Sequence, residues 1–493
     1  MNISIIRYIL GSVLKTEGIL LLLPCLTALY YKETQGYAYL IVAVSAFILG
    51  YLCTLKKPRS TVFYLKEGCI ATASSWILMS VIGSIPFMLT GEIPSFTDAL
   101  FETISGLTTT GSSILSDVEA LSHASLMWRS FTHWIGGMGV LVFVLAILPL
   151  KGGSHMNLMK AESPGPSVGK LVPKVQSTAQ ILYGIYILLT VIQFILLLIG
   201  KMPVFDAITL TFGTAGTGGF GIKNDSIASY TAYQQWVITI FMMMFGINFN
   251  FYYYLLFRQF KKAFRLEEVR YYVGIILAAI LIIFVNTLHL SPNSSTALRD
   301  AAFQVGAIIT TTGYSTADFI LWPTISKTVL VLLMFLGACA GSTGGGMKVS
   351  RLVILFKTVG KELRSYIHPK SIRSITFEHK SVESEVVRST NVFFITYMLI
   401  FATSVFLISL EGQDVVTTFT SVIATFNNIG PGLEAVGPVS NFGHFSHFSK
   451  WVLMFDMLAG RLELFPLLLL FHPLIYKDLF KSRFKKKRNS TSC

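Results

Sequence analysis

Four short turns rich in glycine and threonine are the parts of this chain whose residue types and spacing could do chemistry. Glycine reaches backbone conformations that can turn successive carbonyl oxygens toward one axis. A ring of carbonyl oxygens can replace the hydration shell of a monovalent cation, which is the arrangement that selects potassium. The candidate ligands in the four turns are Thr109, Thr110, Gly111, Thr217, Gly218, Gly219, Thr311, Thr312, Gly313, Asn428, Ile429 and Gly430.

The turns recur inside a longer pattern of apolar span, short amphipathic segment, turn and second apolar span. In the first three copies Asp98, Asp206 and Asp300 each precede the turn glycine by 13 residues. The fourth copy is degenerate, because Thr417 stands at that position and Asp414 is out of register. One such turn would also suit an ordinary outer loop, but four copies favour four pore loops in a single chain.

The segment between each aspartate and its turn has about ten residues, which as a helix measures ~15 Å and crosses only half of a bilayer. We therefore expect re-entrant half-helices. Each aspartate would lie at the outer N-terminus, where a carboxylate complements the helix dipole. The carbonyl ends would point to the membrane centre, where irregular backbone is tolerated only if it is buried or lines water.

The composition is that of a membrane protein, since 53% of the 493 residues are hydrophobic and 13% are charged. Apolar runs such as Ile19–Tyr31, Gly184–Gly200, Tyr271–Leu290 and Val392–Leu410 approach or reach the ~20 residues that cross the hydrocarbon. The predicted fold is an all-α polytopic membrane protein with ten spans, in which four helix–pore loop–helix repeats surround a pseudo-fourfold pore. The expected segments are 1–60 (two N-terminal transmembrane helices), 61–152, 153–262, 263–360 and 390–476 (pore repeats one to four), 361–389 (a cytoplasmic linker) and 477–493 (a basic cytoplasmic tail).

Lysine and arginine outnumber aspartate and glutamate by 39 to 25 and cluster in alternate connections. Examples are 151–178, 258–270, the segment that begins at Lys348 and ends at Arg388, and the tail. By the positive-inside rule these connections are cytoplasmic, so both termini lie inside and the number of spans is even. A nucleic-acid-binding tail would carry the same residues, but membrane anchoring explains them without a nucleic acid. Five cysteines with no C-x-x-C pair predict neither a disulfide framework nor a zinc site.

Five glycines fall within the ten residues 337–346, inside the expected second helix of repeat three. Each glycine costs about 1 kcal/mol relative to alanine in a helix, so we expect an irregular loop that faces the pore just below the turns. A packing surface of small residues between helices is the alternative. The candidate gate residues of the loop are Gly341, Gly344, Gly345 and Gly346.

Arg461 lies about midway along the last long apolar run, where an unpaired charge costs ~2.5–3.5 kcal/mol. Neither Asp456 nor Glu463 stands three or four residues away, where a helical neighbour would face it. We predict that Arg461 lies on the pore axis and forms, with the glycine loop, an electrostatic barrier to cations. A salt bridge between helices, with Glu463 or another acid, is the alternative.

Three motifs give the chain a family resemblance: RSFTHWIGGMG at 129–139, NNIGPG at 427–432 and AGRLELFP at 459–466. Through them, and over nearly its whole length, the chain resembles the Trk/Ktr/HKT potassium transporters. In that family one glycine per repeat is the hallmark of potassium preference, so the resemblance implies potassium uptake across the bacterial inner membrane. A gating loop inside the membrane at the glycine-rich stretch is also implied.

The resemblance further implies a homodimer with one pore per subunit and a cytoplasmic TrkA-like ring that binds NAD, ATP or ADP and controls opening. K⁺ is the expected transported ion, and no covalently bound cofactor is expected. The segments 151–178 and 348–388 are the expected docking surface for the regulator, although basic segments beside anionic lipid have the same composition. A sodium-permeable cation transporter is the alternative function. A membrane-embedded enzyme is disfavoured, because the sequence has no G-x-S-x-G, no H-E-x-x-H and no aspartate dyad at helical spacing.

Overall fold

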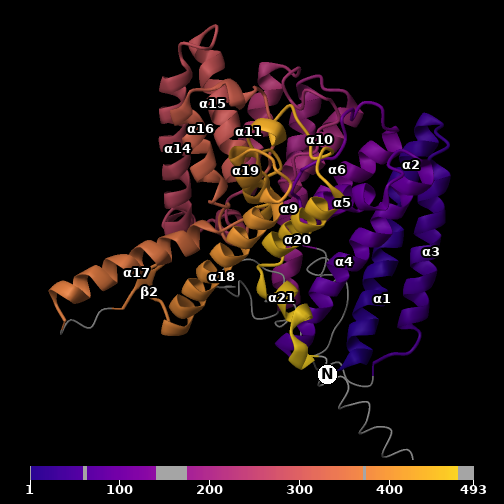
Figure 1. Ribbon diagram of the computed structural model, residues 1–493, viewed down its shortest axis with the longest axis horizontal. Coiled ribbons are helices and arrows are strands. Elements are labelled where there is room, and N and C mark those ends of the chain that lie inside the picture. Colours follow the sequence, from indigo (N-terminus) through magenta and orange to yellow (C-terminus); the bar gives the residue numbers. More distant parts are fainter. Residues whose placement is uncertain (1, 59–63, 140–174, 370–373, 476–493) are drawn as a thin grey trace, which may run out of the picture.

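The computed structural model describes residues 2–58, 64–139, 175–369 and 374–475. These residues are helical apart from connecting loops and one small hairpin of β1 (Thr376–Phe377) and β2 (Lys380–Ser381) (Figure 1). Among them six helical segments are long and apolar enough to cross a membrane, and a seventh is a pair bent by 94°. The six are Ile3–Tyr31 (α1 Ile3–Leu20 with α2 Leu22–Tyr31), Gly36–Thr54 (α3), Leu65–Thr90 (α4), Ala179–Ile199 (within α9, Val175–Ile199), Glu267–Thr287 (α14) and Ser384–Ser409 (α18).

The N-terminal hairpin of α1, α2 and α3 packs on α4 and on the second helix of repeat one, at the right of Figure 1. Glycines allow the close approach of α1 and α3. A Cβ added at Gly18 would lie 2.7 Å from the Ala43 carbonyl oxygen, and one at Gly50 would lie 2.6 Å from that of Gly11. Small residues at helix contacts are the usual way in which membrane helices pack closely.

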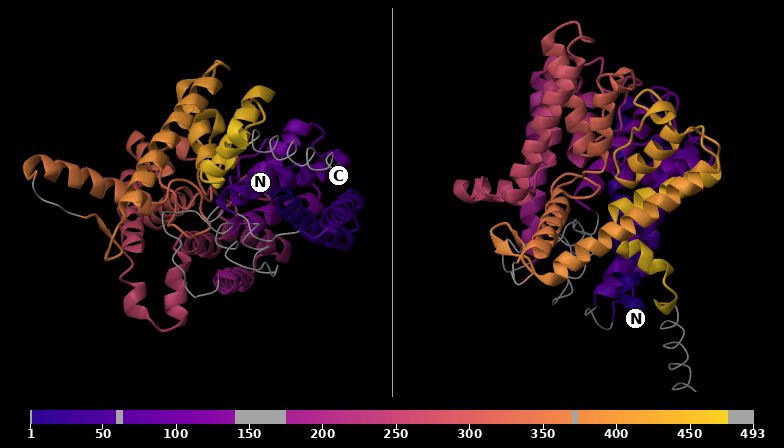
Figure 2. Two further views of the ribbon diagram at one scale, coloured as in Figure 1. Left: turned by 90° about the horizontal axis from the view of Figure 1, so that it is seen from below. Right: turned by 60° about the vertical axis from the view of Figure 1, so that its left-hand side comes forward.

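Each repeat consists of a long helix, a half-helix, a turn and a second helix. The half-helices are α5 (Phe96–Leu107), α10 (Val204–Gly216), α15 (Ser294–Ile309) and α19 (Val415–Phe426). The second helices are α6 (His123–Gly137), α11 (Ala232–Phe245) with α12 (Phe249–Leu256), α16 (Thr324–Met334) with α17 (Val349–Ile367), and α20 (His447–Arg461) with α21 (Phe465–Phe471). The connections hold α13 (Phe260–Ala263), η1 (Phe319–Leu321) and η2 (Glu434–Val436). Seen from below, segments of the four repeats lie round a common centre (Figure 2, left).

The aspartates do not all stand at the helix starts, where the sequence pattern put them. Asp98 and Asp206 occupy the third helical position, Asp300 the seventh, and only Asp414 is an N-cap residue. Their carboxylates instead join the half-helices to other segments. Asp98 pairs with Lys450, and Asp206 accepts a hydrogen bond from the Tyr230 hydroxyl. The feature that recurs is the helix start, which lies 15 residues before the turn glycine in α5, α10 and α19.

The second helices break more often than the sequence suggested. The predicted interruption in repeat three is present, because α16 ends at Met334 and α17 begins at Val349. Repeat two also breaks, between Phe245 and Phe249, and repeat four breaks after Arg461. The helices α6, α16 and α20 have 15, 11 and 15 residues, too few for a full span on their own.

Candidate ion filter and gate

The four glycine-rich turns meet in a closed ring. Turn one is 109–111, turn two is 217–219, turn three is 311–313 and turn four is 428–430. A side chain added to the glycine of any turn would meet a carbonyl oxygen of the next turn. The pairs are Gly111 with Gly218, Gly219 with Thr312, Gly313 with Ile429, and Gly430 with Thr110. All four glycines also line one cavity of about 190 Å³, so the residues predicted from the repeats are brought together.

The ring has the same backbone conformation four times. The glycine of each turn is in the left-handed region, with φ between 80° and 101°. The residue two positions earlier is there as well, with φ between 54° and 59°, although it is not glycine: Thr109, Thr217, Thr311 and Asn428. Such residues are uncommon and persist where the surrounding structure over-determines them. The fourth copy, degenerate in sequence, therefore shares the backbone of the other three.

The RSFTHWIGGMG motif explains how α6 supports the ring. The Nδ1 of His133 is 2.8 Å from the Gly106 carbonyl oxygen of α5, and its Nε2 accepts a hydrogen bond from the Phe220 N–H next to turn two. Gly136 and Gly137 leave no room for a side chain against the C-terminal ends of α5 and α10. The motif thus fixes two half-helices against one second helix.

A buried ion pair lies behind the segments that follow turns one and two. The Arg129 guanidinium is 2.8 Å from the Glu102 carboxylate, and both side chains are almost fully buried. The Ser113 hydroxyl donates to Glu102, and Arg129 donates to the Gly221 carbonyl oxygen. Sequence reasoning did not single out Glu102, because its partner lies 27 residues away in another helix.

The glycine loop, residues 335–348, lies against turns three and four. The Gly345 N–H donates to the Thr311 hydroxyl at 2.7 Å. A Cβ at Gly344 would lie 3.0 Å from the Thr310 carbonyl oxygen, and Gly346 lies next to Asn427. Gly341 is placed differently: its carbonyl oxygen accepts from the Phe249 N–H at the break between α11 and α12. Three of the four predicted gate glycines, Gly344, Gly345 and Gly346, therefore contact turns three and four or the residues just before them. The fourth, Gly341, joins the loop to repeat two.

Lys348, which the charge pattern placed at the start of a cytoplasmic basic segment, is buried in the glycine loop. Its side chain is 1% exposed. The ammonium donates to the carbonyl oxygens of Gly344 and Gly345, at 2.8 Å for the latter. The sequence could not reveal this burial, because the two carbonyl oxygens that Lys348 contacts come close to it only when the loop folds.

Arg461 joins three repeats. It stands at the end of α20 in repeat four, and its guanidinium donates to the Thr343 carbonyl oxygen of the glycine loop at 2.8 Å. It also donates to the carbonyl oxygens of Gly136 and Gly137 at the end of α6, at 2.7 Å for Gly137. Glu463 was considered above as a salt-bridge partner of Arg461. Its carboxylate instead lies 2.5 Å from the guanidinium of Arg351.

The comparison with known proteins agrees with this architecture. A family model described as TrkH, cation transport protein, matches residues 33–482. The chain belongs to the TrkH family. It is 36% identical to the Trk system potassium uptake protein TrkH of Salmonella typhimurium over 97% of this chain and all of that one, and 33% identical to TrkH of Halomonas elongata over 97% and 100%. The crystal structure of the potassium transporter TrkH from Vibrio parahaemolyticus superposes with a TM-score of 0.85 at 31% identity, covering 96% of this chain and 99% of that chain.

Membership of the TrkH family confirms the resemblance seen in the three motifs. It confirms a multi-pass helical membrane protein of a bacterial transport family and not an enzyme. The predicted docking segment 151–178 and the basic tail 477–493 fall wholly or largely outside the described residues.

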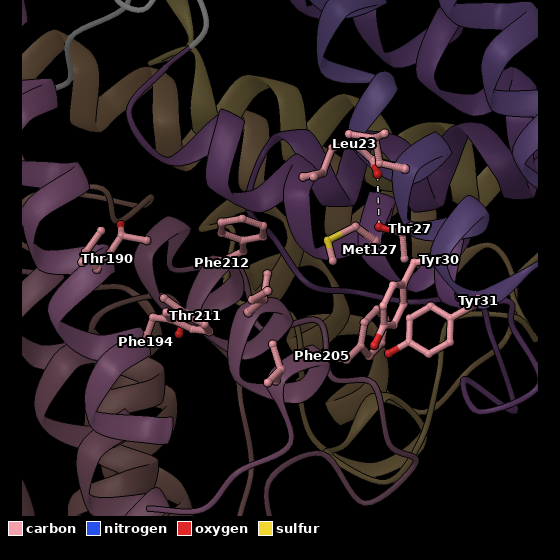
Figure 3. Close-up of a pocket in the computed structure, with 14 residues that line it drawn as sticks. Leu23, Thr27, Tyr30, Tyr31, Met127, Thr190, Phe194, Phe205, Thr211 and Phe212 are labelled. Atoms are coloured by element: carbon pink, nitrogen blue, oxygen red, sulfur yellow. Dashed lines mark hydrogen bonds between the residues drawn. The ribbon is translucent and has the colours of Figure 1, made fainter. Parts of the chain in front are cut away.

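A larger cavity, of about 590 Å³, lies away from the ring (Figure 3). It is lined mainly by apolar side chains of α2, α9 and α10, among them Leu23, Phe194 and Phe212. None of the turn residues lines it. A candidate functional site selected by volume alone would be this cavity, and not the smaller one that the four turn glycines line.

Proposed function

We propose that this TrkH-family chain is a potassium uptake protein of the bacterial inner membrane. The observation that carries the proposal is the closed ring of four turns, each with a glycine and the same backbone. The relatives compared above are potassium uptake proteins or transporters by name. In this proposal the ten spans, four pore repeats and two N-terminal helices predicted from the sequence surround a single filter.

The ligands of the ion are the twelve residues of the four turns. A dehydrated potassium ion needs oxygen atoms on all sides, and a ring with glycine at every quarter supplies backbone carbonyls without side chains in the way. The hydroxyl of Ser112 donates to the Gly430 carbonyl oxygen at 3.0 Å, and Asn428 donates to Thr110 at 2.9 Å. These bonds hold turn four against turn one, which supports a ring of fixed width.

The gate is the glycine loop with Arg461. Residues Gly344, Gly345 and Gly346 lie next to turns three and four, and Gly341 anchors the loop to repeat two. Arg461 and Lys348 bring two positive side chains to the loop. Positive charge below a cation filter raises the energy of an ion there, so this arrangement suits a closed pore.

The remaining assignments rest on the family. We place both termini in the cytoplasm, one pore in each subunit of a homodimer, and a TrkA-like nucleotide-binding ring on the cytoplasmic side. The segment boundaries expected from the sequence stay part of the proposal, with two adjustments. The helix α17 runs through residue 360, so repeat three and the linker share it, and α18 begins at Ser384, so the linker and repeat four share that helix. A sodium-permeable cation transporter remains the second candidate, since Ser112 and Ser113 follow the first turn.

Uptake of rubidium, a potassium analogue, tests the proposal. The chain is expressed with a TrkA-type regulator in a bacterium that lacks its own potassium uptake, and growth at low potassium and rubidium influx against competing sodium are measured. We expect rescue of growth and influx that excess sodium does not inhibit. Membrane-inserted protein that neither rescues growth nor carries rubidium would overturn the proposal, and equal competition by sodium would favour the second candidate.

A further inference from the structure

A buried carboxylate at the start of α14 accepts hydrogen bonds from one residue of the glycine loop and from one residue just after it, in α17. Glu268 is 3% exposed. Its Oε1 accepts the N–H of Ala340 at 2.7 Å and the N–H of Ser350 at 3.0 Å. Its Oε2 accepts from the side-chain amide of Asn248, in the break of repeat two, at 3.3 Å. Glu268, in the first helix of repeat three, therefore bonds to both Ala340 and Ser350. Gly344, Gly345 and Lys348 lie between these two residues in the chain.

These bonds are of the strong kind. A carboxylate that accepts backbone N–H groups forms charge-assisted hydrogen bonds, about twice as strong as neutral ones. Because the group is buried, loss of the carboxylate would leave two backbone donors without their partner, and buried unpaired donors are costly. Glu268 thus adds two strong bonds to those from Thr311, Phe249 and Arg461 that hold the loop.

The same helix end is held from the other side by the small hairpin. The Glu378 carboxylate in the hairpin turn accepts the backbone N–H of Glu268 at 3.0 Å, and the Glu378 N–H donates to Glu267 at 3.1 Å. Lys357 of α17 donates to Glu267 and to the Thr376 carbonyl oxygen. Leu266, the residue at the N-cap position of α14, has an apolar side chain, so Glu378 satisfies a donor that the helix leaves open.

The turn of the hairpin has a backbone conformation that its residues disfavour, so contacts with the rest of the chain must stabilise it. Glu378 and His379 have φ of 51° and 61°, both in the left-handed region. A two-residue turn of this kind favours asparagine and glycine. Non-glycine residues in this region persist where surrounding contacts fix them, and here those contacts are the reciprocal bonds to α14.

We propose that Glu268 is a positioning residue that holds the glycine loop in the closed pore, and that the hairpin Thr376–Ser381 locks it there through Glu378. The inference rests on the proposed function, since it concerns the gate of that pore. Movement of the hairpin would remove the partner of the Glu268 N–H and loosen the start of α14. The carboxylate would then leave the loop, and the loop could leave the ring. His379 and Lys380 are exposed beside Glu378, so the hairpin can be reached from outside the helix bundle.

Rubidium influx into proteoliposomes without any regulator tests this assignment. We compare wild type with Glu268→Ala, Glu268→Gln and Glu378→Gln. Glu385→Ala, an exposed acid in the first turn of α18, is the matched control. We expect basal influx to rise about 10- to 100-fold in Glu268→Ala, as loss of hydrogen bonds to a charged group predicts, and about 2- to 10-fold in Glu378→Gln. Glu268→Gln, which keeps an accepting oxygen, should lie between wild type and alanine.

A second measurement separates positioning from a general loss of structure. Hydrogen exchange of the amides of Ala340 to Ser350 should accelerate in Glu268→Ala, while exchange in α15 and α19 stays at the wild-type rate. Basal influx at the wild-type level in a folded Glu268→Ala protein, or faster exchange throughout the chain, would overturn the inference. Wild type that carries no rubidium even with a regulator would instead overturn the proposed function.

Discussion

The glycines of the four turns have two requirements at once, a left-handed backbone and no side chain. Either alone is common in turns. At Gly313, φ is 82°, and an added Cβ would meet the Ile429 carbonyl oxygen and lie 2.9 Å from Pro431. In the proposed filter, a carbonyl displaced in one turn would no longer face the ion at the same distance as the other three, so we expect ion discrimination to fail before folding does.

Gly313→Ser is therefore expected to reduce the preference for rubidium over sodium by about tenfold or more, which corresponds to ~1.4 kcal/mol. Gly412→Ser is the matched control, because Gly412 has φ of 77° and open space around its Cβ position. Influx of both ions into proteoliposomes measures the ratio. Equal selectivity in the two variants would mean that the ring does not select the ion.

Arg461 gives a second prediction at the residue scale. Its guanidinium ties the glycine loop to the end of α6, so Arg461→Gln should remove both a positive charge and these bonds. We expect regulator-independent rubidium influx to rise about tenfold or more, since hydrogen bonds to charged groups contribute about 1.5–3 kcal/mol each. Unchanged influx together with unchanged dependence on the regulator would remove Arg461 from the gate.

At the scale of elements, the half-helices depend on their caps as well as on burial. Asp414 caps α19 by accepting the N–H groups of Val416 and Thr417 at 2.9 and 3.0 Å. Hydrogen bonds from Thr417, first from its side chain, hold the pKa of Asp414 below its ordinary value. A lowered pKa means that the carboxylate stabilises the fold above the ordinary pKa of about 3.9, and that this contribution is lost as the pH falls through the lower value.

Asp414→Ala should accordingly cost about 0.5–2 kcal/mol of stability at neutral pH, the usual value of an N-cap. The difference from wild type should shrink as the pH falls below about 4. Asp414→Asn keeps a capping side chain and should retain most of the stability with less dependence on pH. Thermal unfolding of the three proteins in detergent across this pH range is the measurement, and a deficit for alanine that does not change with pH would contradict the role of the charge.

The half-helices and turns were predictable because their signals are local and repeated. Three aspartates in register, and glycines where the backbone must be left-handed, can be read along the chain. The exact helix starts were not predictable from the aspartates, since Asp300 is the seventh residue of α15. The contacts of Lys348 and Glu268 were not predictable either, because their partners are backbone groups of a folded loop. Sequence reasoning placed a break in repeat three from its five glycines. The breaks of repeats two and four have weaker local signals, which were missed: Gly246 and Asn248 in the first, and Gly460 and Pro466 in the second.

At the scale of the whole molecule, one chain supplies the complete ring. Turn four contacts turn one directly, through Gly430 and the Ser112 hydroxyl. In the homodimer proposed above, a second copy would therefore add a separate pore and would not need to lend a residue to this ring. This differs from a filter built by four chains, where one defective subunit spoils every pore that contains it.

Mixing experiments follow from that difference. Wild type co-expressed with Gly219→Asp, whose side chain would meet the Thr312 carbonyl oxygen, should give rubidium influx proportional to the wild-type fraction. Purified mixtures at several ratios, with the total protein held constant, are the measurement. Influx that falls more steeply than the wild-type fraction would mean that the copies share a pore.

The bond between the Ser112 hydroxyl and the Gly430 carbonyl oxygen spans 318 positions of the chain. Synthesis proceeds from the N-terminus, so the ribosome has made most of the protein before the last side of the ring exists. A nascent chain that stops earlier lacks turn four and cannot close the ring. A closed ring therefore forms only after nearly the whole polypeptide has been made.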